Sequence, residues 1–286
     1  MTEPIVDCEG LVHIYRTAEL EVVALQGLDL RVEPGEVVAI VGRSGSGKTT
    51  LLNVIAGLEA PSAGKALVGG HDLARMTEEE RDLYRQEVVG YILQHSQANL
   101  VADLNAFENV LLPMTGRSVA ESRQRATFLL EAMGISRLGL NYPGELSGGE
   151  AERLAVAIAM SNEPQILLAD EPTAELDRAT ADSLLLDLRQ LLHESRSAAV
   201  MVTHDKSVER HADRVVQIRD GRTSTQTRWL EQAGKVVADE LLIMDRAGRI
   251  QLPRAYVERL GARGLIRAHL EGDEIRLRRG DQESAK

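Results

Sequence analysis

A glycine-rich stretch near the N-terminus has the residue types that bind a phosphate chain. The sequence GRSGSGKT at 42–49 fits the pattern GxxxxGK[ST] and stands between a strand-like run, VVAIVG, and a helical one, KTTLLNVIAGL. Glycines let backbone N–H groups turn inward around a phosphate, and the following helix N-terminus adds partial positive charge. Lys48 can reach the phosphate oxygens, and the Thr49 hydroxyl can coordinate Mg²⁺. This stretch therefore predicts a nucleoside-triphosphate site.

Two adjacent carboxylates are the natural partners of this loop. Asp170 and Glu171 follow four apolar residues at 166–169, which are typical of a buried strand. Ligands of open α/β sheets bind at the carboxyl ends of the strands. We expect Asp170 to hold Mg²⁺ through a water molecule. Glu171 is expected to act as the general base or to orient the attacking water.

Two further polar residues also follow predicted strands. His204 comes after AAVMVT at 198–203, and Gln94 comes after YIL at 91–93. A single histidine after a strand is usually an ordinary surface or core residue. If the strand at 198–203 lies beside the one at 166–170, however, both end at the same edge of the sheet. His204 then points at the γ-phosphate, and Gln94 can bridge Mg²⁺ and water.

The hydrophobic pattern predicts the elements that position these side chains. Short β-branched runs alternate with longer helical patterns over the first 220 residues. Such alternation predicts parallel strands covered by helices. Before them, LVHIY at 11–15 and ALQGLDLRV at 24–32 indicate antiparallel strands, and VVQIRDGRT at 215–223 indicates a last strand with an Asp-Gly hairpin turn. The predicted fold class is α/β.

Length and composition limit the class of protein. The chain has 286 residues, a net charge of −11 and one cysteine, Cys8, so an intrachain disulfide or cysteine-based zinc site is excluded. Its apolar runs are shorter than the ~18–20 residues of a membrane helix, and its start lacks a secretory signal pattern. We expect cytoplasmic residence. The charge argues against general nucleic-acid binding, but residues 232–286 carry 11 Lys/Arg against 9 Asp/Glu, which indicates a domain boundary near residue 230.

Together, these motifs resemble the ATP-binding-cassette (ABC) family over about residues 5–225. In family order they are the P-loop GRSGSGKT, the Q-loop Gln94, the signature LSGGE (146–150), the Walker B stretch ILLADE, the D-loop AELD (174–177) and the switch His204. The resemblance implies a P-loop cassette at 1–225 with a mixed sheet core, an antiparallel β subdomain and a helical subdomain at about 95–160. It also implies ATP hydrolysis with Mg²⁺.

The resemblance assigns a role to each motif residue. The implied ATP contacts are Tyr15, Gly42, Arg43, Ser44, Gly45, Ser46, Gly47, Lys48, Thr49, Thr50, Ser147, Gly148, Gly149 and Asp177. The implied catalytic residues are Lys48, Gln94, Glu171 and His204, and the implied Mg²⁺ ligands are Thr49, Gln94 and Asp170. Tyr15 would stack on adenine, although it also fits an ordinary strand tyrosine. In such proteins the signature of one subunit closes over ATP on the P-loop of another, so a head-to-tail homodimer is expected.

Within the family, residues 22–64 and 88–114 resemble the MacB/LolD/FtsE branch. That resemblance implies an FtsX/MacB-like membrane permease as partner and a peripheral position at the inner face of the cell membrane. The signature helix departs from the family pattern at two positions, with Glu150 in place of the usual Gln and Ile158 in place of the usual Arg. A carboxylate there adds negative charge near the γ-phosphate, but solvent screening should keep the effect on turnover small.

The C-terminal stretch lies outside a minimal cassette. A linker is predicted at 226–236, and residues 237–282 carry the pattern D-x-x-G-R-I-x-L-P followed by Leu260-Gly261. This pattern resembles the AbrB/SpoVT-type swapped-hairpin fold, which implies a small β-rich domain that dimerises. An alternative interpretation is that the arginines of this segment contact the phosphates of DNA. These arginines are Arg246, Arg249, Arg254, Arg276, Arg278 and Arg279. The small net charge of the segment favours dimerisation or regulation.

Three functions fit a cassette of this kind. The favoured one is the ATPase subunit of an ABC transporter or mechanotransmission complex. The alternative is a soluble ABC ATPase with a DNA-binding or regulatory C-terminal domain. Soluble ABC ATPases of DNA repair or chromosome work usually carry a long coiled-coil or zinc insertion between P-loop and signature. The interval from 49 to 146 has no sustained heptads and no cysteine. A translation-factor-type protein would carry two cassettes, and the sequence has one P-loop.

Overall fold

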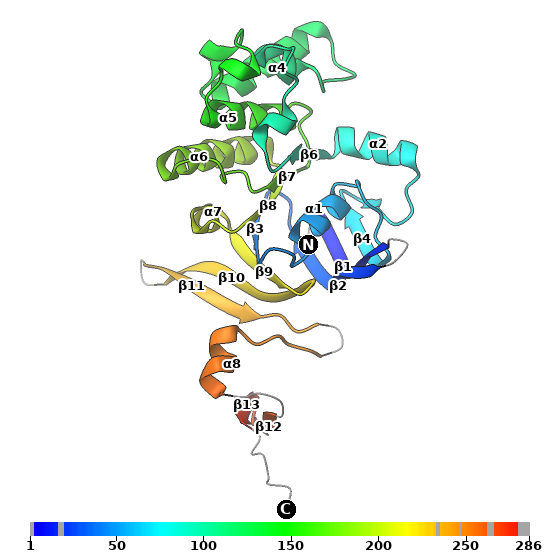
Figure 1. Cartoon of the computed structure of the whole chain (residues 1–286), viewed down its shortest axis with the longest axis vertical. Coiled ribbons are helices and arrows are strands. Elements are labelled where there is room, and N and C mark those ends of the chain that lie inside the picture. The colour runs from blue at the N-terminus through cyan, green and yellow to red at the C-terminus, as the bar shows by residue number, and fades with distance from the viewer. Residues whose placement is uncertain (1–2, 17–19, 233–234, 246–247, 262–265, 280–286) are drawn as a thin grey trace, which may run out of the picture.

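A sheet of seven strands forms the centre of the molecule, in the order β11-β10-β9-β3-β8-β7-β6 (Figure 1). This computed structural model describes residues 3–16, 20–232, 235–245, 248–261 and 266–279. The inner strands are β3 (Val37–Val41), β6 (Val89–Ile92), β7 (Ile166–Asp170), β8 (Ala198–Thr203) and β9 (Arg214–Arg219). They pair in parallel, and every residue of β7 and β8 is buried. Burial on both faces explains why these strands are apolar runs rather than alternating ones.

A second, antiparallel sheet packs against one end of the first. Its strands are β1 (Val6–Arg16), β2 (Glu21–Val32), β4 (Ala63–Val68) and β5 (His71–Asp72), in the order β2-β1-β4-β5. The helix α1 (Lys48–Ile55) lies between the two sheets, and its Leu51, Leu52 and Val54 are fully buried in a core shared by both. The predicted antiparallel subdomain is confirmed.

Helices cover both faces of the central sheet. α2 (Glu78–Glu87) lies on the same side as α1, where its Tyr84 is buried in the shared core. The other face is covered by α3 (Ala106–Leu111), α4 (Val119–Ala132), α5 (Gly148–Ala159), α6 (Arg178–Ser195) and α7 (Lys206–His211). The helices α2, α3, α4 and α5 each begin with a capping box. The N-cap side chain accepts a hydrogen bond from the backbone N–H of the third helical residue, and the side chain of the glutamate at that position accepts one from the N-cap backbone N–H. Figure 1 shows α4 and α5 farthest from the antiparallel sheet. Within the described part of the chain, no helix combines the length and apolar character needed to cross a membrane.

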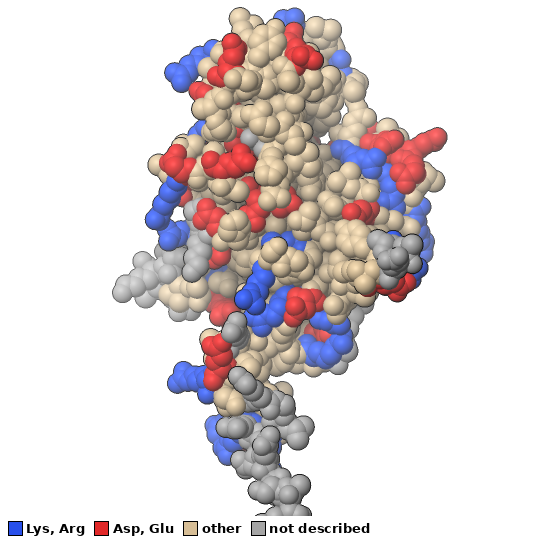
Figure 2. Space-filling view, in the orientation of Figure 1, with Lys and Arg blue, Asp and Glu red and all other residues tan. Residues whose placement is uncertain are grey.

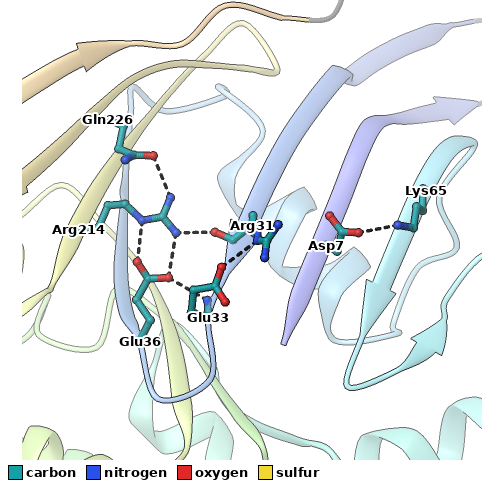
Figure 3. Close-up of polar contacts among 7 residues, drawn as sticks. All are labelled: Asp7, Arg31, Glu33, Glu36, Lys65, Arg214 and Gln226. Atoms are coloured by element: carbon teal, nitrogen blue, oxygen red, sulfur yellow. Dashed lines mark hydrogen bonds and ion pairs between the residues drawn. The ribbon is translucent and has the colours of Figure 1, made fainter. Parts of the chain in front are cut away.

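A buried ion pair joins the two sheets (Figure 3). The Arg214 guanidinium on β9 donates to both carboxylate oxygens of Glu36 (2.7 and 3.0 Å), to the backbone oxygen of Arg31 and to Gln226 Oε1 (3.0 Å). The side chains of Arg214 and Glu36 are only 9% and 18% exposed. Both side chains are charged and largely shielded from water, so each needs the opposite charge of the other to offset its lost hydration.

The C-terminal part differs from the sequence-based prediction. Most of the predicted linker at 226–236 lies in β10 (Arg222–Gln232) and β11 (Lys235–Leu242), which extend the central sheet in antiparallel fashion. The physical reason is a run of alternate β-branched residues: Thr223, Thr225 and Thr227 each pair with β9. Beyond it follow α8 (Arg254–Leu260) and the separate hairpin β12 (Ile266–Glu271) and β13 (Glu274–Arg279), at the lower end of Figure 1.

Candidate nucleotide-binding site

A cavity of about 610 Å³ opens at the carboxyl ends of the parallel strands. It is lined by Tyr15, Val22, Val23, Ala24, Gly42, Ser44, Gly45, Gly47, Lys48, Thr49, Thr50, Gln94, Asp170, Glu171 and His204. The loop after β3 supplies the glycine-rich stretch, and the ends of β6, β7 and β8 supply the polar side chains. The strand at 198–203 does pair in parallel with the strand at 166–170, so the predicted convergence at one sheet edge is confirmed.

The glycine-rich loop has a backbone that only glycine adopts easily. Gly45 and Gly47 have φ values of 75° and 99°. A Cβ on Gly47 would lie 2.6 Å from the backbone oxygen of Ala24, so close packing also excludes a side chain there. The Lys48 ammonium donates to the backbone oxygens of Gly42 (3.0 Å) and Arg43 (3.2 Å), which hold it across the loop.

Ser46 and Arg43 belong to this loop but do not line the cavity. Arg43 is exposed. Ser46 is 5% exposed, and its Oγ is buried with no hydrogen-bond partner among the described residues. A buried hydroxyl without a partner is destabilising, and because Ser46 does not line the cavity, its backbone rather than its hydroxyl belongs to the phosphate loop.

A hydroxyl and a carboxylate meet at the back of the cavity. Thr49 Oγ1 donates to Asp170 Oδ2 at 3.0 Å. Burial is the main influence on the pKa of Asp170 and raises it, while the Thr49 hydrogen bond acts in the opposite direction. Hydroxyl, amide and carboxylate oxygens are the ligands that Mg²⁺ prefers, and Gln94 lines the same cavity. These three side chains fit a magnesium site.

Contacts with His204 hold both carboxylate oxygens of Glu171 in place. Its Oε1 lies 2.8 Å from His204 Nδ1, and its Oε2 accepts from the His204 backbone N–H at 3.3 Å. The Glu171 backbone N–H donates to Val202 O at 2.9 Å, and its φ of 53° is unusual for a residue with a side chain. Such a conformation stores roughly 1–3 kcal/mol of strain and is typical of functional sites.

The mouth of the cavity is aromatic and apolar. The Tyr15 hydroxyl donates to Glu59 Oε2 at 2.8 Å and lies 3.3 Å from Thr50 Oγ1. Burial raises the pKa of Tyr15. Val22 and Val23, which the sequence-based prediction missed, are 48% and 44% exposed beside it. The signal available in the sequence was the pair of adjacent β-branched residues: successive side chains of a strand point to opposite faces, so the two valines could not both face the same core.

The signature and the D-loop lie outside this cavity. Ser147 is the N-cap of α5, and Asp177 is the N-cap of α6. A Cβ on Gly149 would lie 2.8 Å from Thr180 Cγ2, so this glycine lets the two helix starts pack together. A Cβ on Gly148 would meet nothing within 4 Å, so packing within the described chain does not require that glycine.

The two departures in the signature helix have structural roles. Glu150 Oε2 accepts from the Ser147 backbone N–H (3.0 Å) and from Ser147 Oγ (2.7 Å), and Ser147 Oγ accepts from the Glu150 N–H. The hydrogen bond from the Ser147 side chain is the main reason that the pKa of Glu150 is lowered. Ile158 is partly buried and packs against the core beneath α5.

Among the C-terminal arginines whose side chains the structure describes, two are paired with carboxylates. Arg249 donates to Asp245 at 2.7 Å, and Arg276 pairs with Glu271 at 2.7 Å. Arg276, Arg278 and Arg279 lie on β13, and Arg254 is the first residue of α8. Arg246 lies outside the described residues. Figure 2 shows Lys/Arg and Asp/Glu side chains interspersed on the visible face. On that face, the described residues show no stripe of basic side chains of the kind that binds phosphates.

Comparisons with known proteins agree with this geometry. Residues 25–174 match the family model described as ABC transporter. The chain is 42% identical over 224 residues to the lipoprotein-releasing system ATP-binding protein LolD of Chromohalobacter salexigens, covering 78% of this chain and 94% of that protein. It is 40% identical over 230 residues to the macrolide export ATP-binding/permease protein MacB of Sodalis glossinidius, covering 80% of this chain and 35% of that protein.

The structure also resembles solved structures. A dimeric post-hydrolysis state of the ATP-binding cassette MJ0796, bound to ADP and Pi, has a TM-score of 0.72 at 33% identity and covers 79% of this chain and 100% of that one. The cbiO1 protein from Clostridium perfringens has a TM-score of 0.72 at 27% identity, covering 79% of this chain and 88% of that one.

Proposed function

The chain belongs to the ABC transporter family, and from that premise we propose that it drives a separate membrane permease through an ATP-dependent homodimer. It is an ATPase, and ATP with Mg²⁺ is what its family binds. The observation that carries the proposal is the meeting of the P-loop, Asp170, Glu171, Gln94 and His204 in one cavity. Because the match covers 94% of a protein named only for ATP binding and 35% of one that is also a permease, it supports the ATPase role.

In the proposed reaction the P-loop holds the phosphate chain. Its N–H groups and Lys48 neutralise the phosphate oxygens. Thr49, Asp170 and Gln94 would hold Mg²⁺, which supplies positive charge to the phosphates. Val22, Val23 and the Tyr15 ring would receive the adenine.

Glu171 is proposed as the general base. Its carboxylate takes a proton from a water molecule as the water oxygen bonds to the γ-phosphorus, and the bond from that phosphorus to the ADP oxygen breaks. His204 keeps the carboxylate in position, as the 2.8 Å contact supports. The products are ADP and inorganic phosphate.

The signature is proposed to serve the partner subunit. Ser147, Gly148 and Gly149 lie outside the cavity of their own chain, and the open space beside Gly148 supports close approach of a second molecule. The start of α5 would then direct its N–H groups at the γ-phosphate bound by the other subunit, while Asp177 would contact the opposing P-loop. A homodimer with two shared sites follows.

A permease of the FtsX/MacB-like type is the proposed membrane partner, with the chain at the cytoplasmic face of the inner membrane. The stretch from Gln94 to Met114 is the proposed contact. Leu93, Val101 and Leu112 are 42%, 41% and 59% exposed on or beside it, and exposed apolar side chains favour a protein interface.

The C-terminal part is proposed as a dimerisation or regulatory module of the AbrB/SpoVT-like type. Ile266, Leu270 and Ile275 on the β12–β13 hairpin are 41%, 73% and 62% exposed. A two-stranded hairpin is marginal alone, so a second copy that covers these side chains would stabilise it. DNA binding is the less favoured role.

Affinity purification of the tagged full chain from membranes of its native host tests the permease. The expected result is co-purification of a membrane protein with few membrane helices. Leu112→Asp should remove that protein, whereas Leu83→Asp is the matched control because Leu83 is similarly exposed (56%) but lies on α2. A chain that remains without a membrane partner contradicts the transporter proposal.

A further inference from the structure

The turn between β9 and β10 supports the P-loop directly. The Gly221 N–H donates to Ser46 O at 3.0 Å, and Gly221 O accepts from the Gln26 N–H at 2.9 Å. Asp220 and Gly221 both have positive φ, 51° and 71°, as in a type I′ hairpin turn. The turn therefore connects the P-loop to β2 by backbone hydrogen bonds.

The turn and the nucleotide loop are each packed tightly against neighbouring strands. A Cβ on Gly221 would lie 2.5 Å from Ala24 O on β2, and a Cβ on Gly42 of the P-loop would lie 2.4 Å from Ile218 O on β9. Backbone lies against backbone at both points. A shift of the turn is therefore passed to the P-loop through the hydrogen bond from Gly221 to Ser46, because the close packing around both leaves little room for compensation.

The segment from Ile243 to Leu252, which follows β11, contacts the same turn. Arg219 Nη1 donates to Leu252 O at 3.2 Å, Arg222 Nη1 donates to Asp245 Oδ2 at 3.4 Å, and Gln251 Nε2 donates to Asp220 Oδ2 at 3.4 Å. These bonds involve the turn residue Asp220 and arginines on both sides of it.

Described residues within this segment also bond to one another. Asp245 N–H donates to Arg249 O at 2.9 Å, and Met244 pairs with Ile250. Asp245 also accepts from the Arg249 backbone N–H (2.9 Å) and side chain (2.7 Å). These bonds hold the Asp245 carboxylate in place, so its contact with Arg222 forms at little further entropic cost.

We propose that Asp245 and Gln251, outside the cassette, are positioning residues for the P-loop. They fix the Asp220–Gly221 turn, the turn fixes Ser46, and Ser46 is part of the loop that surrounds the phosphates. This inference rests on the proposed nucleotide site. It also gives the segment after β11, which carries Asp245 and Gln251, a route to that site.

Kinetics of the full chain test this proposal. Asp245→Asn and Gln251→Ala should each raise the KM for ATP by about 3–10-fold, with kcat within about twofold, because the loop is displaced while Glu171 and His204 are not. Affinity for a fluorescent ATP analogue should fall by the same factor. Asp245→Glu, which keeps the carboxylate, should recover most of the loss. Glu271→Gln is the control, because it breaks a C-terminal ion pair distant in sequence from the turn and should leave KM unchanged.

A double-mutant cycle adds a second readout. Arg222→Ala and Asp245→Asn combined should raise KM no more than the larger single change, because both remove the same contact. Unchanged KM and analogue affinity in Asp245→Asn and Gln251→Ala, with melting temperatures near that of the wild type, overturn the proposal. If Asp245→Asn unfolds, Gln251→Ala decides alone. Wild-type chain that binds no ATP contradicts the nucleotide site itself, so the two failures are distinguishable.

Discussion

Replacing Glu150 by glutamine isolates the effect of one charge in the signature. The glutamate accepts two hydrogen bonds from Ser147, at 3.0 Å from the backbone N–H and at 2.7 Å from Oγ. Glutamine keeps an oxygen in the same place and the same side-chain length. Glu150→Gln therefore preserves the shape of the capping box and removes its negative charge.

The cost in stability follows from the hydrogen bonds. A bond to a charged group contributes about 1.5–3 kcal/mol and a neutral one about 0.5–1.5 kcal/mol, and loss of an acidic residue at a helix N-terminus adds about 0.3–1 kcal/mol. Solvent exposure of this site places the sum at the low end, ~1 kcal/mol. For a domain of about 200 residues this lowers the melting temperature by roughly 2–4 °C.

Glu150→Gln should lower the activation barrier for ATP hydrolysis by a similar amount, so turnover should rise slightly while stability falls slightly. The carboxylate keeps the Ser147 hydroxyl hydrogen on its own helix, whereas the proposed dimer needs that hydrogen for the partner's phosphate. Removing the charge weakens the hold on the hydroxyl and reduces repulsion of the phosphate. Screening limits the gain, so we expect the ATPase rate to rise by less than ~10-fold, ~1.4 kcal/mol in barrier terms.

Steady-state ATPase assays and thermal melting of the full chain measure both effects. Glu121→Gln is a matched control, because Glu121 accepts from Ser118 N–H (2.9 Å) and Oγ (2.6 Å) in the same capping box on α4. It should lower the melting temperature equally and leave the rate unchanged. Near-complete loss of turnover in Glu150→Gln with a normal melting curve, or an equal change of rate in Glu121→Gln, would refute this reasoning.

Four further results are expected. Glu171→Gln should bind ATP and trap the dimer in gel filtration while turnover falls by about 10²–10⁴-fold; a normal rate would remove Glu171 as the base. Tyr15→Ala should weaken ATP binding by about 1–3 kcal/mol in a displacement assay, the usual value of a base–aromatic stack; unchanged affinity leaves Tyr15 an ordinary strand residue. Arg214→Ala should lose about 3–5 kcal/mol in urea unfolding, because Glu36 is left buried and unpaired, whereas Arg31→Ala, whose ion-pair side chains are 57% and 45% exposed, should lose less than about 1 kcal/mol. Ser147 lowers the pKa of Glu150, so the capping box stabilises at neutral pH and this contribution is lost as pH falls through the depressed value; Glu150→Gln should flatten acid unfolding, and an identical acid profile contradicts the capping account.

Local sequence determined the residues that carry the chemistry. A phosphate-binding loop needs glycines and a lysine at fixed spacing, and buried parallel strands need continuous apolar runs. Both requirements are met within a few neighbouring residues, so GRSGSGKT and the carboxylates after ILLA were readable without coordinates. The meeting of β3, β6, β7 and β8 at one edge also followed, because parallel strands carry their carboxyl ends to the same side.

Contacts between distant parts of the chain were decided only by the tertiary structure. Arg214 pairs with Glu36 across 178 positions, and Gln251 reaches Asp220 across 31; no spacing rule links such residues. The threonine-rich segment after residue 222 gave too weak an apolar pattern to predict a strand, and its pairing with β9 makes it one. Glu150 combines a feature visible in the sequence with one that only the structure reveals. Its position in the signature is visible in the sequence, but its hydrogen bonds with Ser147 exist because the chain turns into α5 at that serine.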